Sequence, residues 1–355
     1  MDKYADLKYE CIAIGSLPHK KLEDAISMIK QYNYDIPFCP QLVNYSQNED
    51  MLYQYLENMP AISINNDKIF INNNSNEYLE KSENLSCDFE KILSDINSQE
   101  LDKYSISKDF SVAFKSFIDF VKNTKPKYAK IQITGPFTLS VNIFDTQGQK
   151  SCFDKNIVEN ITKILILKTL WQIREIKNIS QNTIPIVFID EPTLAQLNNN
   201  EYEKLSQKEI IENIKKISDK IKEFSGLSAV HCCGNCNWSD LLKIGLNMIN
   251  FDAYTYAKEM NTYTEDLKEF LKSGGKLVWG IVPTLNQQAL ETANLEVLAQ
   301  KFEDAKSVLI ENGIDRALIE NNSLISSSCG CATLSVELTE KTFKLAKDLS
   351  KKLKG

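Results

Sequence analysis

The sequence predicts an α/β protein with the architecture of a (β/α)8 barrel, and three observations support that prediction. Short apolar, β-branched runs alternate with longer stretches of helical periodicity along most of the 355 residues. About eight such runs can be distinguished, and repeated strand–helix units build parallel sheets. No Gly-rich dinucleotide or phosphate-binding motif supports the alternative, a doubly wound open sheet. We therefore expect one domain over residues 1–355.

The first strand candidates, at 9–14 and 35–42, precede the regular part of the repeat. Residues 61–72 alternate apolar and polar side chains, which predicts a small β-hairpin inserted outside the barrel. Helical patterns at 88–97 and 107–123 complete this N-terminal insertion. The remaining strand candidates are 130–134, 185–189, 227–232, 248–251, 276–281 and 317–325, and helices are expected near 155–178, 206–224, from 237, and near 260–273, 295–312 and 334–353.

Composition excludes several classes of protein. A formal net charge of -7, without a basic stripe, argues against a nucleic-acid surface. No apolar run reaches the roughly 18 residues of a membrane span, and the first residues lack the apolar core of a signal peptide. We therefore expect a cytoplasmic protein. In that compartment the nine cysteines are expected to be metal ligands or catalytic groups rather than disulfides.

The most informative local motif pairs a histidine with a cysteine. The chain holds only two histidines, and one of them, His231, ends an apolar run two residues before Cys233. Side chains two positions apart on a strand point the same way, so these two face one side and Cys232 the other. Cys329 and Cys331 end another apolar run. An imidazole and thiolates on separate strand ends suit a zinc site with an open position; the alternative is a buried histidine among inert core cysteines.

Further polar motifs fall where predicted strands end. Because active sites of (β/α)8 barrels lie at the carboxyl ends of the strands, these motifs are expected to converge on one face. They are Ile-Gly-Ser at 14–16, Thr-Gly-Pro at 134–136, Asp-Glu-Pro at 190–192, Asp252, and Ser-Cys-Gly at 328–330.

In this order the motifs resemble the cobalamin-independent methionine synthase family, in its C-terminal catalytic barrel. The corrinoid-linked thiol methyltransferases of the uroporphyrinogen decarboxylase superfamily are also similar. The resemblance implies a core-only member, without the N-terminal half of the long synthases, that transfers a methyl group to a thiol, homocysteine, with the help of zinc. It rests on Ile14-Gly-Ser-Leu-Pro18, Asn48-Glu-Asp-Met51, Thr134-Gly-Pro136, Ile189-Asp-Glu-Pro192, His231-Cys-Cys-Gly-Asn235 and Cys329-Gly330, which cover nearly the whole chain.

The resemblance implies that His231, Cys233 and Cys329 hold the zinc ion. The long enzymes have a glutamate ligand at the end of the next strand, and Asp252 stands at that position here. A carboxylate can bind zinc, and the alternative for Asp252 is a place beside the ligands. Cys331 and Cys236 are rival ligands.

The resemblance also implies how an amino-acid thiol would be bound. Backbone groups of Ile14 and Ser16 would hold its carboxylate, with Gly15 allowing close approach. Asp190 would be the catalytic residue that takes the ammonium group, and Glu191 would stand beside it at the barrel mouth. The alternative for this acidic pair is a helix cap followed by a first-turn carboxylate.

Two departures from the family bear on the substrates. Where the long synthases grip the ammonium with a glutamate, this chain has Tyr53 or Gln54, so Gln54 becomes a candidate contact. The histidine that helps to release folate is absent from 279–284. His19 could substitute for it, and the alternative for His19 is a solvated loop histidine. A tertiary amine needs a proton to leave, whereas a methyl-corrinoid does not. The sequence therefore favours a methyl-corrinoid protein over methyl-folate as the donor.

Other functions stay open. A different thiol, similar to coenzyme M, fits the same chemistry as homocysteine. A decarboxylase of the same superfamily, acting on a porphyrinogen, would need an Arg-rich entry motif that the first predicted strand lacks. A non-catalytic barrel, in which zinc only holds strands together, would be favoured by a closed shell of four protein ligands.

Overall fold

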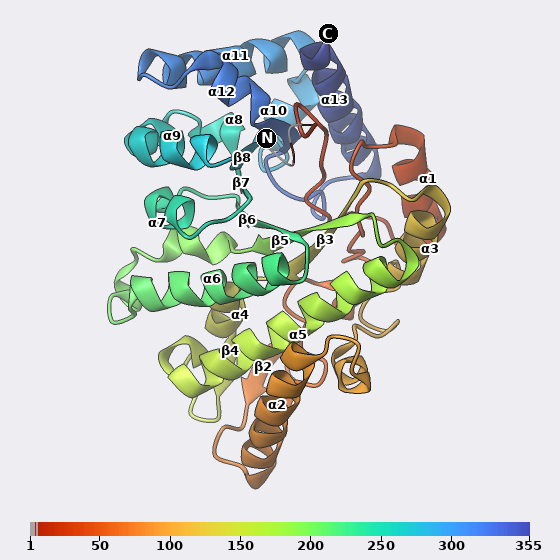
Figure 1. Cartoon of the computed structure of the whole chain (residues 1–355), viewed down its shortest axis with the longest axis vertical. Coiled ribbons are helices and arrows are strands. Elements are labelled where there is room, and N and C mark those ends of the chain that lie inside the picture. The colour runs from red at the N-terminus through yellow and green to blue at the C-terminus, as the bar shows by residue number, and fades with distance from the viewer. Residues whose placement is uncertain (1–3, 5) are drawn as a thin grey trace.

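The computed structural model describes residue 4 and residues 6–355, and it is a mixed α/β fold around a curled parallel sheet (Figure 1). Within these residues each neighbouring pair of strands in the main sheet is parallel. The predicted α/β class with a parallel sheet is therefore confirmed. The strands, in their order across the sheet, are β3 (Tyr128–Thr134), β5 (Ile184–Asp190), β6 (Leu227–Cys232), β7 (Met248–Phe251), β8 (Lys276–Val282) and β9 (Ser323–Ser327).

Helices connect successive strands along the outer side of the sheet (Figure 1), as parallel pairing requires. Their positions agree closely with the predicted helices from residue 155 onward. No helix among the described residues is both long and apolar enough to cross a membrane. The helices that follow the strands are α4 (Pro136–Val141), α5 (Lys155–Ile179), α6 (Gln207–Glu223), α7 (Trp238–Lys243), α8 (Ala253–Tyr256), α9 (Thr264–Lys272), α10 (Gln287–Thr292), α11 (Leu295–Glu311), α12 (Arg316–Asn321) and α13 (Val336–Lys354).

The N-terminal part contains the predicted hairpin and more helix than expected. Asn66 and Asp67 turn the hairpin with φ angles of 49° and 59°, the left-handed pair that a tight hairpin turn needs. The hairpin also pairs in parallel with a short strand that the sequence did not reveal. The elements of this part are α1 (Leu22–Tyr32), β1 (Ile62–Asn65), β2 (Lys68–Ile71), α2 (Asn76–Ser94), α3 (Phe114–Thr124) and β4 (Ile143–Asp145), with 3-10 turns at Gln47–Glu49, Gln99–Tyr104 and Ser151–Phe153. Later 3-10 turns lie in the connections after β5 and β7, at Pro192–Gln196, Asn200–Tyr202 and Glu259–Tyr263.

Two predicted strands, at 9–14 and 35–42, are extended segments between β9 and β3 rather than regular strands. Gly15, with a φ of 139°, turns the backbone at the end of the first segment, and Pro37 and Pro40 have no N–H to donate in the second. The eight-stranded barrel is therefore shown only in part. The isolated parallel bridges are Cys11–Ile325, Ser16–Gln41 and Phe38–Lys130.

The last strand begins later than residue 317, where the sequence predicts its start. Residues Arg316–Asn321 form α12, and β9 begins only at Ser323. The side chain of Asp315 accepts a hydrogen bond from the Leu318 N–H at 2.9 Å, which satisfies a free donor at the helix start and favours helix over strand.

Strand alternation divides the apolar side chains into an inner and an outer layer. Ile186 and Phe188 of β5 belong to a cluster enclosed by the curled sheet, whereas Val187 and Ile189 pack against the covering helices. The residues that continue the inner face toward the carboxyl ends of the strands are polar, as Asp190 is in β5. The inner layer therefore ends in a polar cap, and the predicted site residues lie there.

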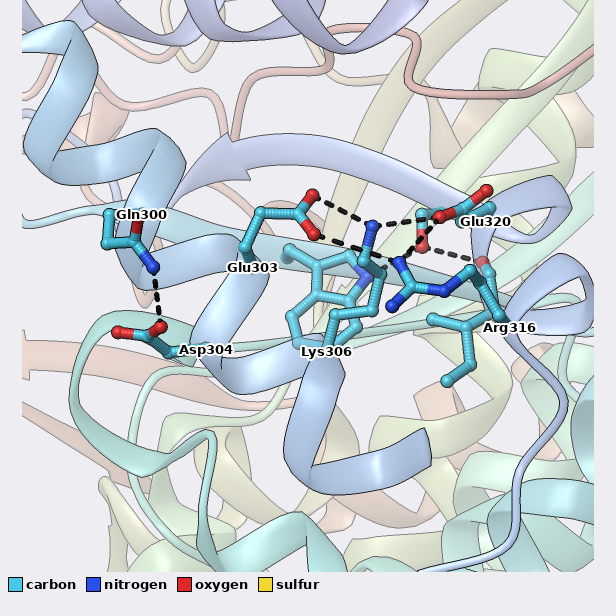
Figure 2. A network of polar contacts seen from close by, with 9 residues as sticks. Gln300, Glu303, Asp304, Lys306, Arg316 and Glu320 are labelled. Carbon is cyan, nitrogen blue, oxygen red and sulfur yellow. Dashed lines mark hydrogen bonds and ion pairs between the residues drawn. The ribbon is translucent and has the colours of Figure 1, made fainter. Parts of the chain in front are cut away.

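An ion-pair network around the buried Lys306 fastens α12 to α11 (Figure 2). Lys306 is only 3 % exposed, and its ammonium donates to Glu303 at 2.8 Å and to Glu320 at 2.9 Å. Arg316 adds a contact of 3.4 Å to Glu320. The lysine therefore joins the two helices that precede β9.

Replacing Lys306 by alanine should destabilise the fold. Glu303 and Glu320 would lose the cation that they share, and the packing of the buried lysine side chain would also be lost. We expect the free energy of unfolding to fall by about 1–3 kcal/mol, measured by urea denaturation. The matched control is Lys344→Ala, which removes an exposed pair with Asp348 and should leave the unfolding midpoint nearly unchanged. Equal effects of the two substitutions would contradict the structural role of Lys306.

Candidate metal centre

The structure brings together one histidine and two cysteines from two separate strand ends. His231 lies in β6, Cys233 follows directly, and Cys329 lies just beyond β9. One potential ligand atom from each residue lies within 4.8 Å of the other two. Three of the four predicted zinc ligands therefore converge.

Strand alternation separates these ligands from the neighbouring cysteines, as predicted. Cys232 belongs to the outer apolar layer and is fully buried. Its thiol lies 3.5 Å from the carbonyl oxygen of Gly234, and Cys236 hydrogen-bonds with it. Cys232 and Cys236 are therefore paired with each other outside the His231 group.

Asn250 of β7 orients the ligand histidine. Its side-chain oxygen hydrogen-bonds Nδ1 of His231, while its amide nitrogen donates to Val278 O and to Ser326 Oγ, each at 2.9 Å. Because the amide nitrogen is engaged with these two oxygens, Oδ1 acts as the acceptor and Nδ1 carries the proton. This tautomer leaves the lone pair on Nε2 for a metal ion, which is the usual outer-shell arrangement of a metal-binding histidine.

The two thiols share a proton in an asymmetric way. The hydrogen bond from Cys329, together with a hydrogen bond and charge interaction with His231, lowers the pKa of Cys233 to about 4 against the opposing effect of burial. The same hydrogen bond and burial raise the pKa of Cys329 well above its usual value. The surroundings therefore favour the thiolate form of Cys233, and metal ligands of this type must be deprotonated.

Thr284, just beyond β8, clamps the backbone of Cys329. Its hydroxyl accepts from the Cys329 N–H at 2.9 Å and donates to the Cys329 carbonyl at 3.0 Å. The hydroxyl of Ser327 reaches the same carbonyl at 2.7 Å. Sequence reasoning missed Thr284; its only signal was its place directly after an apolar run.

The prediction that Asp252 is a fourth ligand is not supported, because Asp252 caps α8. Its Oδ1 accepts from the Thr255 N–H at 3.0 Å, and among the described residues it does not join the ligand group. The rival Cys331 is also directed elsewhere, since Thr339 and Thr342 hydrogen-bond its thiol. The cap of α8 therefore engages one carboxylate oxygen of Asp252.

Asp190 lies beside the group, as predicted. It is the cross-strand partner of His231 and is 6 % exposed, and its Oδ1 has no hydrogen-bond partner among the described residues. Burial raises the pKa of Asp190 to about 6, although Lys130 and His231 oppose this. A buried acceptor without a donor is costly, so this oxygen is suited to a donor on a ligand.

Glu191 is fully buried and points to a different place. Its carboxylate accepts from the N–H groups of Phe137 and Thr138 at 2.9 and 2.8 Å and from the Thr138 hydroxyl at 2.6 Å. It therefore closes the amino end of α4. The expected alternative, a cap on the helical turn that begins at Pro192, concerned a different element, because Glu191 makes no side-chain cap there. Burial raises the pKa of Glu191 to about 7.

The predicted turn at 14–16 lies against the ligand loop, whereas Gln54 is engaged elsewhere. The Cys331 N–H donates to the Ser16 carbonyl at 2.9 Å. Gln54 accepts from Gln41 at 2.8 Å and donates to the Phe110 carbonyl at 2.9 Å. Its amide oxygen and nitrogen both have protein partners, so Gln54 has little left to offer a substrate.

Lys130 and Gln132 of β3 are interior polar residues that sequence reasoning missed. Lys130 is fully buried, and its ammonium donates to the Ile14 carbonyl and, at 2.7 Å, to Gln132 Oε1. Burial lowers the pKa of Lys130 to about 8, and nearby Asp190 opposes this. Their signal was the alternation of polar side chains through an apolar strand.

Comparisons with known proteins add little to this geometry. No family model and no curated protein matches the chain. A solved structure from Coccidioides immitis, provisionally described as a fructose-1,6-biphosphate aldolase, is similar over 68 % of this chain and 83 % of that one, with 10 % identity and a TM-score of 0.28.

The substitutions Cys329→Ala and Asp252→Ala should distinguish a metal ligand from a helix-capping residue. The first is expected to abolish stoichiometric zinc, because it removes one of the three grouped donors. The second should retain zinc and lower the free energy of unfolding by about 1 kcal/mol, through loss of the α8 cap. Zinc content by elemental analysis and urea denaturation measure the two effects. Loss of zinc in the Asp252 variant would restore that residue as a ligand.

The raised pKa of Asp190 predicts a pH-dependent stability. Between about pH 4 and 6 the unfolded chain has lost this proton while the folded chain retains it, so stability falls as pH rises through this window. Asp190→Asn removes the effect. In metal-free protein, its free energy of unfolding relative to wild type should rise from pH 4 to 6 and then level off. A difference that is flat over this range would contradict the prediction.

Proposed function

We propose that this chain is a zinc-dependent methyltransferase with a thiol acceptor, of the type of the cobalamin-independent methionine synthases. The observation that carries the proposal is an incomplete donor set, one imidazole and two thiols. Asp252, Cys331 and Cys236 are each engaged elsewhere. Structural zinc sites are closed by four protein ligands, whereas catalytic sites keep a position open. An open set favours catalysis over a purely structural ion.

We also propose that the two extended N-terminal segments complete a (β/α)8 barrel. Support comes from the parallel bridges that link the first segment to β9, the second to β3, and the two segments to each other. In such a barrel the ligands lie at the carboxyl ends of the strands, where the active sites of this fold occur.

The donor set fits zinc. Nitrogen and sulfur ligands are those that zinc takes in proteins, and Asn250 fixes the tautomer that leaves Nε2 of His231 available. Bound zinc would supply one thing to the reaction, an acceptor thiol that is deprotonated at neutral pH. Thr284 would keep Cys329 in place, and the buried surroundings would exclude water from the acceptor.

Asp190 supports an amino thiol, and homocysteine in particular, as the acceptor. Its unpartnered Oδ1 would accept a hydrogen bond from the ammonium group of the substrate. A thiol of the coenzyme M type has no ammonium and would leave this buried oxygen unsatisfied. The interior position of Asp190, next to His231, suits a substrate whose sulfur and ammonium are a few bonds apart.

A methyl-corrinoid protein is the proposed methyl donor. The chain has no histidine other than His19 and His231. His19 is 3 % exposed, and burial lowers its pKa, which makes it a poor source of the proton that a folate amine would need on leaving. A corrinoid donor requires no such proton.

The decisive assay uses zinc-loaded protein with methylcobalamin as donor and homocysteine as acceptor, and methionine is the expected product. Asp190→Asn should raise KM for homocysteine by about tenfold or more, because a charge-assisted hydrogen bond to the ammonium is weakened. KM for 2-mercaptoethanol, which has no ammonium, should change little.

Two results would count against the proposal. Absence of methyl transfer from both methylcobalamin and methyl-tetrahydrofolate, with zinc bound, would reject a methyltransferase. Efficient transfer from methyl-tetrahydrofolate alone would retain the acceptor chemistry but overturn the corrinoid donor.

A further inference from the structure

A buried lysine lies beneath the turn that borders the metal centre. The Lys130 side chain projects from β3 into the interior and is fully buried, with its ammonium 4.8 Å from the ring centre of Phe188. Its hydrogen-bond acceptors are the Ile14 carbonyl and Gln132 Oε1. A buried cation is tolerated only where polar partners replace its hydration, so the charge is tied to the turn that contains Ile14.

The turn rests directly on Lys130 and Gln132. Gly15 has a φ of 139°, and a Cβ there would stand 2.9 Å from Gln132 Oε1 and 3.2 Å from the Lys130 ammonium. Backbone and side chains are therefore in close contact, with no room for a larger residue. Without the ammonium, the inward carbonyl of Ile14 would lose its donor, and the turn would lose a support on its interior side.

The same turn supports the loop that carries Cys329. Ser16 accepts the Cys331 N–H at 2.9 Å through its carbonyl. A Cβ on Gly330 would come within 1.9 Å of the Ser16 hydroxyl, so the two segments touch at the residue next to the ligand. A displaced turn would therefore displace the Cys329 loop.

We propose that Lys130 is a positioning residue of the metal centre, which holds the 14–16 turn against the 329–331 loop and so fixes the Cys329 sulfur relative to His231 and Cys233. The lysine touches neither metal nor acceptor. The inference rests on the metal site of the proposed function, and is independent of whether a methyl group is transferred there.

The test compares zinc dissociation constants, measured by chelator competition, for wild type, Lys130→Met, Lys130→Arg and Lys168→Met. Lys168 is the matched control, because it is also fully buried but donates to the Ser105 carbonyl at 3.2 Å and contacts no ligand. Lys130→Met should weaken zinc binding about 10–100-fold, and Lys130→Arg should restore most of it. Lys168→Met should lower the urea midpoint and leave zinc affinity unchanged.

If Lys130→Met binds zinc as tightly as wild type, or if Lys168→Met loses as much affinity, the positioning role of Lys130 is overturned. The proposed function would not be affected by either result. A wild-type protein that binds no zinc would overturn the proposed function with it. If Lys130→Met does not fold, Gly15→Ala provides the second route, because the φ of 139° and the 2.9 Å approach of its Cβ to Gln132 Oε1 force the turn to shift while Lys130 is intact. Zinc binding should also be weaker in that variant. An unchanged zinc affinity would count against the proposal that the 14–16 turn positions the Cys329 loop.

Discussion

The site depends on the register of three parallel strands. Asp190 of β5 pairs with His231 of β6, and His231 pairs with Asn250 of β7. Because side chains alternate along a strand, a shift of one residue in either pairing would turn a member of this row to the outer layer. The apolar residues that precede the row, such as Phe188 and Ala229, lie in the inner core. Their burial fixes the register and thereby brings an acid, an imidazole and an amide together.

Hydrogen bonds from neighbouring strands hold the site residues in place. Asn250 connects His231 to β8 and β9 through Val278 and Ser326, and Thr284 holds the backbone of Cys329. Polar groups in an interior are stable only when each has its partners. The histidine and the second cysteine are therefore held by residues of neighbouring strands and loops, and Ser327 of its own segment also holds Cys329.

Much of this arrangement could be predicted from the sequence, and the failures have physical causes. The period-two logic that set His231 and Cys233 apart from Cys232 held, because it depends only on the chain being extended. Asp252 and Glu191 were assigned to the site by position alone. Hydrogen bonds to the amino ends of α8 and α4 engage both carboxylates. The cap by Asp252 is local, three residues away at Thr255, whereas Glu191 bonds to Thr138, 53 residues earlier in the chain.

The residues that were missed have contacts that are distant in sequence. Lys130 and Ile14 are in contact although the second extended segment, not the first, is bridged to β3, because the long Lys130 side chain reaches through the interior to the first segment. Asn250 stood in an apolar run, where a lone polar side chain was the only sign of an interior role. The irregular first strands could not be anticipated in detail, since the turn at Gly15 depends on the side chains beneath it.

The ligands come from opposite ends of the second half of the sheet, and this gives a bound ion a mechanical role. His231 and Cys233 belong to the β6 end, Cys329 to the β9 end, and β7 and β8 lie between them. An ion held by all three would act as a cross-link that closes a long loop of chain, and such links restrict the unfolded ensemble most when the loop is long. Metal supply would then govern how firmly the C-terminal half of the sheet stays curled, in addition to any chemistry at its mouth.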